Sequence, residues 1–415
     1  MAQGFTGAPP APSRLNFWNP FTGGDGERMR AMEAAYRARH RETELKSATF
    51  VWGNPYYTKL SLATLGGRPP QVAVAHLSRV PTLAQAGLLT ELDPAELERH
   101  GLSRAKFDRR PWEKAHVDGA LYAVPLDTHP FALYVRTDLA DKAGLLDRKG
   151  DLPDLDGPDA FLDALKAVKE VTGAWGCSVA SVKDPATQFR LFWSFYRQLG
   201  GGDLVADRGR RVVVDTEAAA ETLAYIRRLA REKVVPTGAD GAGGAITLLN
   251  TGRAGFLLDG VWQVLAVRDA KVKFDVRPLP RVFKEAPYAC AADSHALVLP
   301  KAPSARARRL DASLEFAAAM LHDSRLWAEG GHIPAWLPTQ RSHAYRSLVP
   351  QSHYAAAADG AAYEPAAWYG GAGSSLQIVV GDAVSSVFTG ASSPSAGAAR
   401  IRAELRELAA QPAPV

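Results

Sequence analysis

Strand-like and helix-like patterns alternate along the N-terminal part of the chain. Three short apolar runs are typical of strands: residues 15–18, 49–52 and 71–75. Helical spacing separates these runs, as where Met29, Met32 and Tyr36 recur three and four residues apart on one face. Strands that alternate with helices predict an α/β fold in which a mainly parallel sheet is flanked by helices.

Polar and aromatic residues follow each of these predicted strands. Ligands of parallel sheets bind beyond the carboxyl ends of the strands, so these residues are expected to share one rim. Asn54 is also expected to cap a helix that begins with Pro55, and Asp25 to cap the helix before it. The candidate ligand contacts of this region are Asn19, Thr22, Gly23, Trp52, Asn54 and His76.

Two extended runs, residues 121–124 and 131–135, meet at a polar triplet. The triplet is Asp127, Thr128 and His129, and a proline flanks it on each side. This pattern predicts two strands that polar residues interrupt, in a segment that crosses between two lobes.

A second triplet of the same kind, Asp293, Ser294 and His295, lies at the boundary between two extended segments. Residues 330–336 (GGHIPAW) are rich in turn formers and are a candidate for another crossing. Residues 238–245 are rich in glycine, which predicts a flexible loop.

The length of the chain, 415 residues, exceeds that of one ordinary domain and favours two lobes. Each lobe is expected to combine two separate segments, and a flexible leader precedes them. The expected ranges are 14–124 plus 285–332 for the first lobe, 125–284 plus 333–415 for the second lobe, and 1–13 for the leader.

Charge and hydropathy exclude some classes of protein. The net charge is +5, from 49 basic and 44 acidic residues, and no basic block with interleaved aromatic residues accompanies it. Nucleic acid is therefore not expected as a partner. No apolar run reaches the roughly 18 residues of a transmembrane helix. Residues 1–13 lack the apolar core of a signal peptide.

Catalytic motifs of serine hydrolases, zinc proteases, P-loop proteins and EF-hands do not occur in the sequence. Asp127, Asp259 and Asp293 could supply the carboxylate pair of a glycoside hydrolase. Aspartates at loop tips, however, more often form turns or accept hydrogen bonds. No catalytic residue is predicted, and a glycoside-processing enzyme remains the alternative from a different class.

A metal site is a rival interpretation of the histidines that flank polar residues at strand ends, His76, His129 and His295. Cys177 and Cys290 lie far apart and form no C-x-x-C pair, which disfavours zinc or thioredoxin-like chemistry. We therefore predict no metal and no cofactor. The two cysteines are expected to be buried thiols, although a disulfide between them stays open.

Sugar ligands require aromatic platforms together with planar groups that donate and accept hydrogen bonds. Each tryptophan near a predicted loop tip could equally be a core residue. Arg79 is the one basic residue at these tips, which argues against a phosphate or carboxylate ligand. The candidate platforms are Trp52, Trp193, Trp262 and Trp368, and Asp259 precedes Trp262 at the end of a predicted strand.

The order of these motifs resembles that of the family 1 extracellular solute-binding proteins of ABC importers, the maltose-binding-protein-like group. Seven segments carry the resemblance and span nearly the whole chain: FWNPFTGGDGERMRAME, LATLGGRPPQVAVAH, AGLLTELD, DGALYAVPLDTHPFALYVRTDLADKAGL, TGRAGFLLDGVW, SHALVLPKAP and WAEGGHIPAW. Gln71 departs from the family pattern, which usually has an aspartate before the valine at this strand.

The resemblance implies a two-lobed periplasmic-binding-protein-like fold with three hinge crossings that closes around its ligand. It implies a monomer without enzymatic activity that delivers a sugar or oligosaccharide to the permease of an ABC importer. The implied location is extracytoplasmic, in the periplasm or as a lipoprotein on the membrane, although the sequence shows no signal segment. It also places Gly331 and His332 at the third crossing, beside the ligand.

The identity of the sugar, its linkage and its length stay open at this point. Within the binding class, the alternative is a receptor for another small polar solute, such as a glycerophosphodiester.

Overall fold

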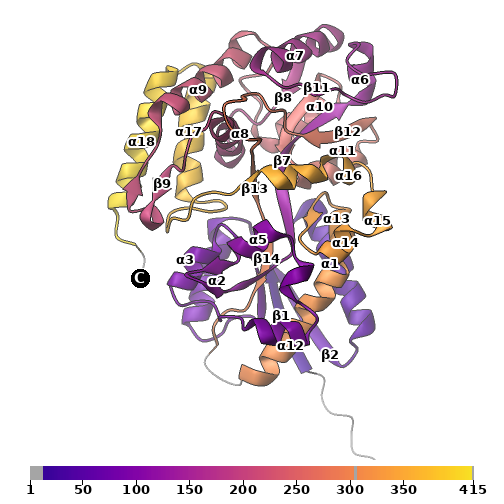
Figure 1. Ribbon diagram of the computed structural model, residues 1–415, viewed down its shortest axis with the longest axis vertical. Coiled ribbons are helices and arrows are strands. Elements are labelled where there is room, and N and C mark those ends of the chain that lie inside the picture. The colour runs from indigo at the N-terminus through magenta and orange to yellow at the C-terminus, as the bar shows by residue number, and fades with distance from the viewer. Residues whose placement is uncertain (1–12, 303–305, 414–415) are drawn as a thin grey trace, which may run out of the picture.

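The computed structural model describes residues 13–302 and 306–413, and the chain forms two lobes, each built on a β-sheet flanked by helices (Figure 1). This architecture confirms the expected two-lobed α/β fold. The predicted leader, residues 1–13, lies outside the described residues except for Ser13, with which the first strand begins.

The first lobe is built mainly from the N-terminal third of the chain. Its elements are β1 (Ser13–Asn19), α1 (Gly23–Arg39), β2 (Thr43–Thr49), α2 (Asn54–Leu65), β3 (Val72–His76), α3 (Val80–Gln85), α4 (Pro94–Arg99), η1 (Arg104–Lys106), α5 (Arg109–Lys114), β4 (His116–Val117), β5 (Ala120–Leu121) and β6 (Ala123–Pro125). Three later elements complete it: β14 (His295–Val298), α12 (Arg306–His322) and α13 (Ser324–Ala328). The strand order of its sheet is β2-β1-β3-β14-β6.

The core of the first lobe lies between this sheet and its helices. Met29, Met32 and Tyr36 of α1 are fully buried against Phe17 and Phe316, so the predicted apolar face of this helix is confirmed.

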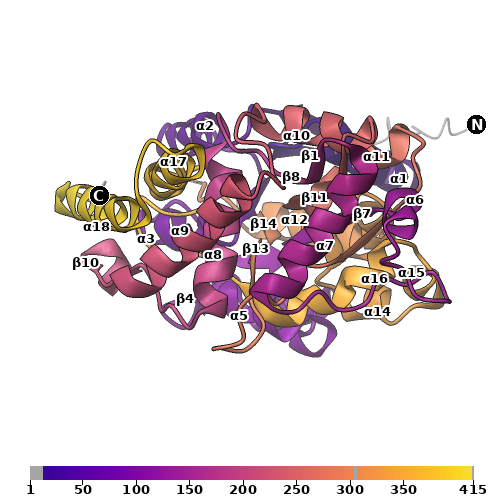
Figure 2. The ribbon, with the colours of Figure 1, turned by 90° about the horizontal axis from the view of Figure 1, so that it is seen from above.

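The second lobe takes most of the remaining chain. Its elements are β7 (Asp127–Arg136), α6 (Thr137–Lys142), α7 (Pro158–Thr172), β8 (Trp175–Ser178), α8 (Pro185–Gln198), β9 (Val205–Ala206), η2 (Asp207–Gly209), β10 (Arg211–Val212), α9 (Thr216–Arg231), α10 (Gly241–Asn250), β11 (Ala254–Gly260), η3 (Val261–Gln263), α11 (Val264–Asp269), β12 (Phe274–Pro278) and β13 (Cys290–Asp293). The C-terminal part adds β15 (Ile333–Pro334), α14 (Leu337–Gln340) and α15 (His343–Arg346) at the junction of the lobes, then α16 (Gln351–Tyr354), η4 (Ala355–Gly360), β16 (Ala361–Ala362), α17 (Ser375–Thr389) and α18 (Pro394–Ala410). Seen from above, α17 and α18 lie beside α8 and α9 on one side of this lobe (Figure 2).

Both sheets are mixed, so the expectation of mainly parallel sheets is wrong. In the first sheet β1 is parallel to β2 and β3, but β14 is antiparallel to β3 and β6. In the second sheet β7 is antiparallel to β11, β12, β13 and β15, and parallel pairs occur only for β11 with β8 and β13 with β16 among the described strands. Two of the antiparallel pairs follow from the passages between lobes, because β13 returns beside β7 and β14 beside β6.

β7 is a continuous ten-residue strand that begins at the junction and runs into the second lobe (Figure 1). The predicted interruption at Asp127, Thr128 and His129 is therefore wrong. Strand pairing satisfies the backbone there, because Thr128 lies opposite Ile333 of β15 and His129 lies opposite Asp293 of β13. The break falls instead at Leu126, whose N–H donates to the carbonyl of His295.

Within the described residues, three passages connect the lobes. The first lies at Leu126, between β6 and β7, and the second at Ser294, between β13 and β14. The third follows β15, since Trp336 is still buried in the core of the first lobe whereas α16 packs on β12 of the second. β13 lies in the range 285–332 that the sequence assigns to the first lobe, and it pairs with β7 in the second sheet.

Several local predictions are corrected by the structure. β2 ends at Thr49, so residues 50–52 follow the strand rather than form it. Residues 241–250 form helix α10 in place of the predicted flexible loop, because Ala245 and Leu249 bury one face despite the glycines. The N-cap positions of α1 and α2 are Thr22 and Gly53, where we expected Asp25 and Asn54.

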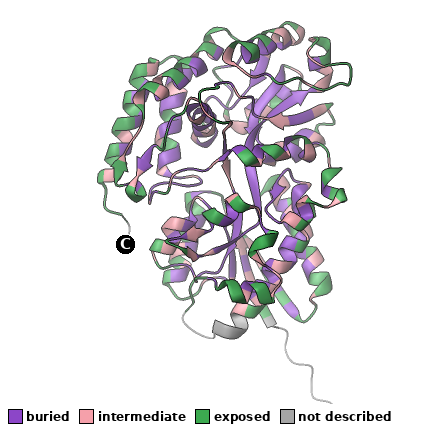
Figure 3. Cartoon of the chain, in the orientation of Figure 1, coloured by how far each residue is buried: buried purple, intermediate pink, exposed green. Residues whose placement is uncertain are grey.

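Burial follows the layers of the fold, with buried strands at the centre of each lobe and exposed outer faces on the helices (Figure 3). Cys177 and Cys290 are buried, unpaired thiols in the core of the second lobe. Within the described ranges, each helix is too short or too polar to cross a membrane.

Candidate functional site

A cavity of about 390 Å³ lies between the two lobes. The first lobe contributes the loop between β1 and α1 and the end of β3, and the second contributes the start of α8 and the segment from the end of β11 to α11. Residues predicted from the sequence that line this cavity are Thr22, Gly23, Trp52, His76, His129, Asp259, Trp262 and His295.

Three imidazole rings gather at one wall of the cavity. The ring centroids of His129 and His295 lie 4.2 Å apart with an interplanar angle of 25°, and the ring of His76 lies 4.6 Å from that of His295. The sheet brings them together, because His76 and His295 lie opposite each other on paired strands. The indole of Trp262 meets His129 edge-on at 5.8 Å, and that of Trp52 lies 6.2 Å from His76.

A buried carboxylate, that of Asp127, contacts the rings of His129 and His295 and orients them. Its Oδ1 accepts a hydrogen bond from Nδ1 of His129 at 3.0 Å, and its Oδ2 accepts one from Nδ1 of His295 at 2.7 Å. The backbone N–H of His295 donates to Oδ1 at 2.8 Å, and the indole N–H of Trp327 donates to Oδ2 at 2.5 Å. Trp327 is a fully buried residue in the core of the first lobe.

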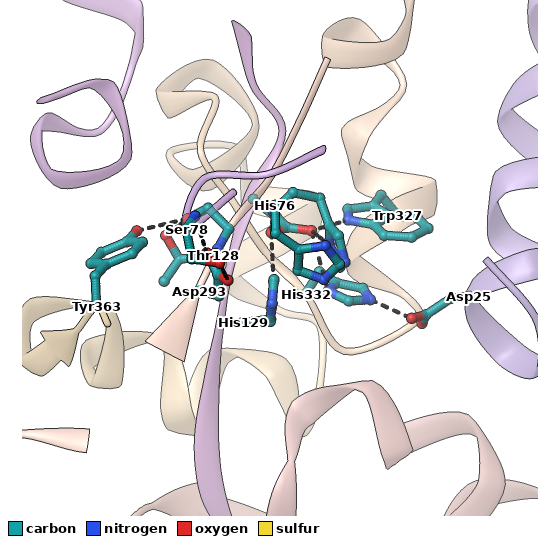
Figure 4. A network of polar contacts seen from close by, with 12 residues as sticks. Asp25, His76, Ser78, Thr128, His129, Asp293, Trp327, His332 and Tyr363 are labelled. Atoms are coloured by element: carbon teal, nitrogen blue, oxygen red, sulfur yellow. Dashed lines mark hydrogen bonds and ion pairs between the residues drawn. The ribbon is translucent and has the colours of Figure 1, made fainter. Parts of the chain in front are cut away.

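His332 reaches the same carboxylate from the segment before β15. Its Nδ1 lies 3.3 Å from Oδ2 of Asp127, and its Nε2 lies 2.9 Å from Oδ1 of Asp25 (Figure 4). Its ring stacks on the indole of Trp327 with 4.2 Å between centroids. Segments at all three passages therefore deliver a histidine to one buried aspartate.

The carboxylate of Asp127 is ionised, and the rings of His129 and His76 are neutral. Burial would raise the pKa of Asp127, but the imidazoles of His295, His129 and His332 hold this pKa well below its ordinary value. Burial, together with the nearby His295, lowers the pKa of His129 to about 3. Burial and the nearby His295 and His129 likewise lower the pKa of His76 well below its ordinary value.

His76 is held from the side away from Asp127. Its Nδ1 lies 2.7 Å from the hydroxyl of Tyr57, and its Nε2 accepts a long hydrogen bond of 3.5 Å from the indole N–H of Trp52. His76 and His129 thus present neutral rings to the cavity, and the Nδ1 atom of each is already paired. Such rings can donate or accept hydrogen bonds to an uncharged polar ligand.

The other members of the two triplets lie behind the wall of the cavity. The hydroxyl of Thr128 lies 3.4 Å from that of Ser294, which lies 2.7 Å from the hydroxyl of Tyr363. The carboxylate of Asp293 accepts hydrogen bonds from the backbone N–H of Ser78, at 3.2 Å, and from its hydroxyl. These contacts fasten the first and second passages to both lobes.

Asn19 and Asn54, predicted as ligand contacts, also lie outside the cavity. Oδ1 of Asn19 accepts a hydrogen bond from the backbone N–H of Phe21 at 3.1 Å, which shapes the loop that leads into α1. Oδ1 of Asn54 accepts one from the guanidinium of Arg79 at 2.7 Å.

Two glycines allow close approaches beside the cavity. Gly331 has φ +114°, and a Cβ atom there would lie 1.9 Å from the carbonyl oxygen of Val261. Gly331 therefore serves the contact between the third passage and the second lobe, and it does not line the cavity. A Cβ atom at Gly260 would lie 1.9 Å from the ring of Trp262, so only glycine leaves room for this indole.

Two candidate tryptophans do not reach the cavity. Trp193 is 1% exposed in the core of the second lobe, and its indole N–H donates to the carbonyl of Ala362 at 3.0 Å. Trp368 packs against the same core and meets Tyr369 edge-on. The sequence places all four tryptophans beside predicted loop tips. It could therefore not distinguish Trp193 and Trp368 from Trp52 and Trp262, which do line the cavity.

Several residues that line the cavity were missed by sequence reasoning, mostly at the start of α8 and after β11. Arg190 is the most informative, because its guanidinium lies over the indole of Trp262, 4.8 Å from the ring centroid. The sequence signal was the pair Asp184-Pro185, since Asp184 caps α8 by accepting from the N–H of Thr187 at 3.0 Å. The lining residues missed are Pro20, Phe21, Gly24, Asp25, Asp184, Ala186, Thr187, Arg190, Ala242, Gln263 and Ala266.

Asp259 lines the cavity at the end of β11. Its Oδ1 accepts a hydrogen bond from the backbone N–H of Gly260 at 2.7 Å. Burial raises the pKa of Asp259 to about 7, so this side chain exchanges a proton near neutral pH.

Comparison with known proteins agrees with this geometry. The family model of bacterial extracellular solute-binding proteins matches residues 32–330. The maltodextrin-binding protein MdxE of Bacillus subtilis is 24% identical over 227 residues, which cover 52% of this chain and 48% of that protein. A maltooligosaccharide ABC transporter solute-binding lipoprotein of Streptococcus pneumoniae serotype 4 is 25% identical over 299 residues, 67% of this chain and 62% of that protein. The matched part of the chain thus spans less than two thirds of the length of either relative.

Solved structures share the whole fold. The GacH receptor of Streptomyces glaucescens superposes with a TM-score of 0.79 at 21% identity, covering 96% of this chain and 98% of that one. The sugar-binding protein MalE of Xanthomonas citri gives a TM-score of 0.79 at 17% identity with the same coverage. The family match over residues 32–330, supported by this shared fold, shows that the chain belongs to the bacterial extracellular solute-binding proteins.

Proposed function

We propose that this chain is the extracytoplasmic receptor of an ABC importer and that it captures a sugar or oligosaccharide between its lobes. The composition of the cavity wall carries this proposal. The indoles of Trp52 and Trp262 are apolar platforms, and the neutral imidazoles beside them can donate and accept hydrogen bonds. The cavity, about 390 Å³, falls in the range of roughly 300–1,000 Å³ that is usual for small-molecule sites.

The names of similar proteins support the same class of ligand. The relatives in Bacillus subtilis and Streptococcus pneumoniae are named for maltodextrin and maltooligosaccharides, and the GacH receptor was solved with acarbose. By this analogy the chain would deliver its ligand to a membrane permease, and we propose that it does so as a monomer.

Closure of the lobes is the proposed mechanism. A ligand in the cavity touches the β1–α1 loop of the first lobe and the α8 start of the second. It therefore stabilises the arrangement in which both lobes are close together, and the permease would distinguish this loaded form from the open one.

We propose binding without catalysis. The carboxylates at the cavity already have partners: Asp25 contacts His332, Asp184 caps α8, and Asp259 accepts from Gly260. Incubation of the protein with maltooligosaccharides should leave them intact in chromatography. Shortened products would instead support the glycoside-processing alternative.

A second candidate ligand is an anionic polar solute such as a glycerophosphodiester. The observation that favours it is the guanidinium of Arg190 in the cavity wall, because guanidinium groups bind phosphate oxygens well.

Isothermal titration calorimetry against maltose, maltotriose, longer maltooligosaccharides and glycerophosphocholine decides between the two. We expect heat and a thermal-stability increase with at least one saccharide. Binding of glycerophosphocholine with no response to any saccharide would replace the sugar proposal.

A further inference from the structure

We propose that Asp127, His129, His295 and His332 form a binding site for a divalent transition-metal ion of the zinc class, buried where the three passages between the lobes meet. This site adds to the proposed ligand cavity and does not depend on what that cavity binds.

The ligand atoms already converge. One carboxylate oxygen and one nitrogen from each of the three imidazoles lie within 4.8 Å of one another, and all four residues are buried. The Nδ1 atoms of His129, His295 and His332 lie 3.0, 2.7 and 3.3 Å from the carboxylate oxygens of Asp127. Ligand atoms around a tetrahedral zinc ion, at bonds of about 2.0–2.1 Å, lie about 3.3 Å apart, so small movements open the cluster for a metal.

Hydrogen bonding alone leaves one nitrogen of this cluster without a partner. A carboxylate has about four acceptor positions, and four N–H groups occupy those of Asp127. They are Nδ1 of His129, Nδ1 and the backbone nitrogen of His295, and Nε1 of Trp327. Nδ1 of His332 is buried and has no hydrogen-bond partner among the described residues.

The other nitrogen of His332 determines what Nδ1 can do. Nε2 lies 2.9 Å from the carboxylate of Asp25, which can only accept, so Nε2 carries the ring proton. In the neutral ring Nδ1 is then a bare lone pair that faces a carboxylate oxygen 3.3 Å away. This contact is repulsive unless a proton or a metal cation lies between the two atoms. A carboxylate that fixes the outer nitrogen of a histidine is also the usual support of a metal ligand.

The electrostatic surroundings favour a cation at this position. Two carboxylates face the ring of His332, with oxygens of Asp25 and Asp127 at 2.9 and 3.3 Å from its two nitrogens. His129 and His295 can each bind a metal through Nδ1 once the ring proton is carried by Nε2. Both of these rings line the cavity, which gives an ion a route to the buried cluster.

The ligand types select the metal. Three imidazole nitrogens and one carboxylate oxygen suit zinc and its neighbours, whereas magnesium and calcium prefer oxygen ligands throughout. Four protein ligands close the coordination shell, as in structural zinc sites. The proposed role is therefore to hold the passages together.

The test is metal retention by the full chain after treatment with EDTA, incubation with Zn²⁺ and desalting. We expect about one zinc per chain in the wild-type protein, by inductively coupled plasma mass spectrometry. His332→Gln should abolish retention, and Asp25→Asn should weaken zinc affinity by roughly 10- to 100-fold. His40→Gln is the matched control, because His40 forms a surface group with Glu42 and Glu315 that could also attract metal.

Three results would overturn the proposal: no zinc in the wild-type protein, equal zinc in His332→Gln, or loss of zinc in His40→Gln. Wild-type protein with no zinc would mean that a proton occupies the space beside His332. Cobalt keeps the test decisive if His332→Gln does not fold. Co²⁺ bound to the wild-type cluster should give the intense visible absorption of four-coordinate cobalt, and weak bands of hydrated cobalt would contradict the site.

Discussion

Arg190 lies over the indole of Trp262, with its guanidinium carbon 4.8 Å from the ring centroid. The two residues come from α8 and η3 and both line the cavity. This stacking covers one face of the ring and leaves the rest of the indole beside the cavity.

The first prediction concerns this indole. Trp262→Ala removes an aromatic platform, so sugar affinity should fall by about tenfold or more, which is about 1.4 kcal/mol of binding free energy. Calorimetry measures the change. Trp193→Phe is the matched control, because Trp193 is a core residue away from the cavity. Trp193→Phe should lower the free energy of unfolding and leave sugar affinity within about twofold. Loss of affinity in Trp193→Phe but not in Trp262→Ala would contradict the assignment of Trp262 to the cavity.

The second prediction concerns His76. His76→Gln removes a ring from the cavity wall but not from the Asp127 cluster. Sugar affinity should decrease while zinc retention is unchanged. Calorimetry and metal analysis on the same preparation separate the two effects, and a parallel loss of both would show that His76 is also a metal ligand.

The third prediction concerns Asp127. Asp127→Asn leaves a single acceptor oxygen for the N–H groups of His129, His295 and Trp327, and it removes the charge that faces them. The free energy of unfolding should decrease by on the order of 3–5 kcal/mol in urea denaturation. Thr128→Ser, at the next position, should change it by less than about 1 kcal/mol. Similar values for the two variants would exclude Asp127 as the centre of the junction.

The fourth prediction concerns Gly331. Gly331→Ala places a Cβ atom against the carbonyl of Val261 in a backbone conformation that favours glycine. Closure of the lobes should be impaired, so small-angle scattering should show a larger radius of gyration with ligand than for the wild-type protein. Gly238→Ala, where a Cβ atom meets nothing within 4 Å, is the control. A fully compact, ligand-bound Gly331→Ala protein would contradict this account.

The fifth prediction is a pH dependence that involves Glu364. Burial raises the pKa of Glu364 to about 7, although the N–H groups of Gly371 and Gln377 that it accepts from oppose this. The folded state therefore binds this proton more tightly than the unfolded state, whose glutamate titrates near pH 4.5. The contribution of Glu364 to the free energy of unfolding decreases as pH rises from about 4.5 to about 7 and is constant above that.

Glu364→Gln removes this titration. Relative to the wild-type protein, the variant should gain about 2–3 kcal/mol of unfolding free energy between pH 5 and pH 8. Urea denaturation of the unliganded proteins at both pH values measures the gain. Parallel pH profiles for the two proteins would show that Glu364 titrates normally.

The predictable part of the fold followed from local patterns. The face of α1 with Met29, Met32 and Tyr36 is buried as its spacing indicated, and the two-lobed class followed from the order of the motifs. Helix α10 was not predicted because its glycines disfavour a helix when only the local sequence is considered. In the fold, tertiary packing buries Ala245 and Leu249 on one face of this segment. The direction of strand pairing was also missed, since it depends on partners distant in the sequence.

The candidate site was likewise predictable from the sequence only in part. Both polar triplets were visible in the sequence, but their members face different directions once β7 and β14 are paired. His129 and His295 reach the cavity, whereas Thr128 and Ser294 bond to each other behind it. Arg190 was not predicted because its contact with Trp262 joins α8 to η3, and these two elements are distant in the sequence.

The position of β14 between β3 and β6 has a consequence for how the chain folds as it leaves the ribosome. Both neighbours are synthesised long before β14, and each keeps an unpaired edge until residue 298 has emerged. β7 likewise waits for β13 and β15. The nascent chain can therefore complete the central strand pairs of both sheets only late in translation. Until then it remains incompletely folded and can be bound by chaperones or by other proteins that recognise unfolded chains.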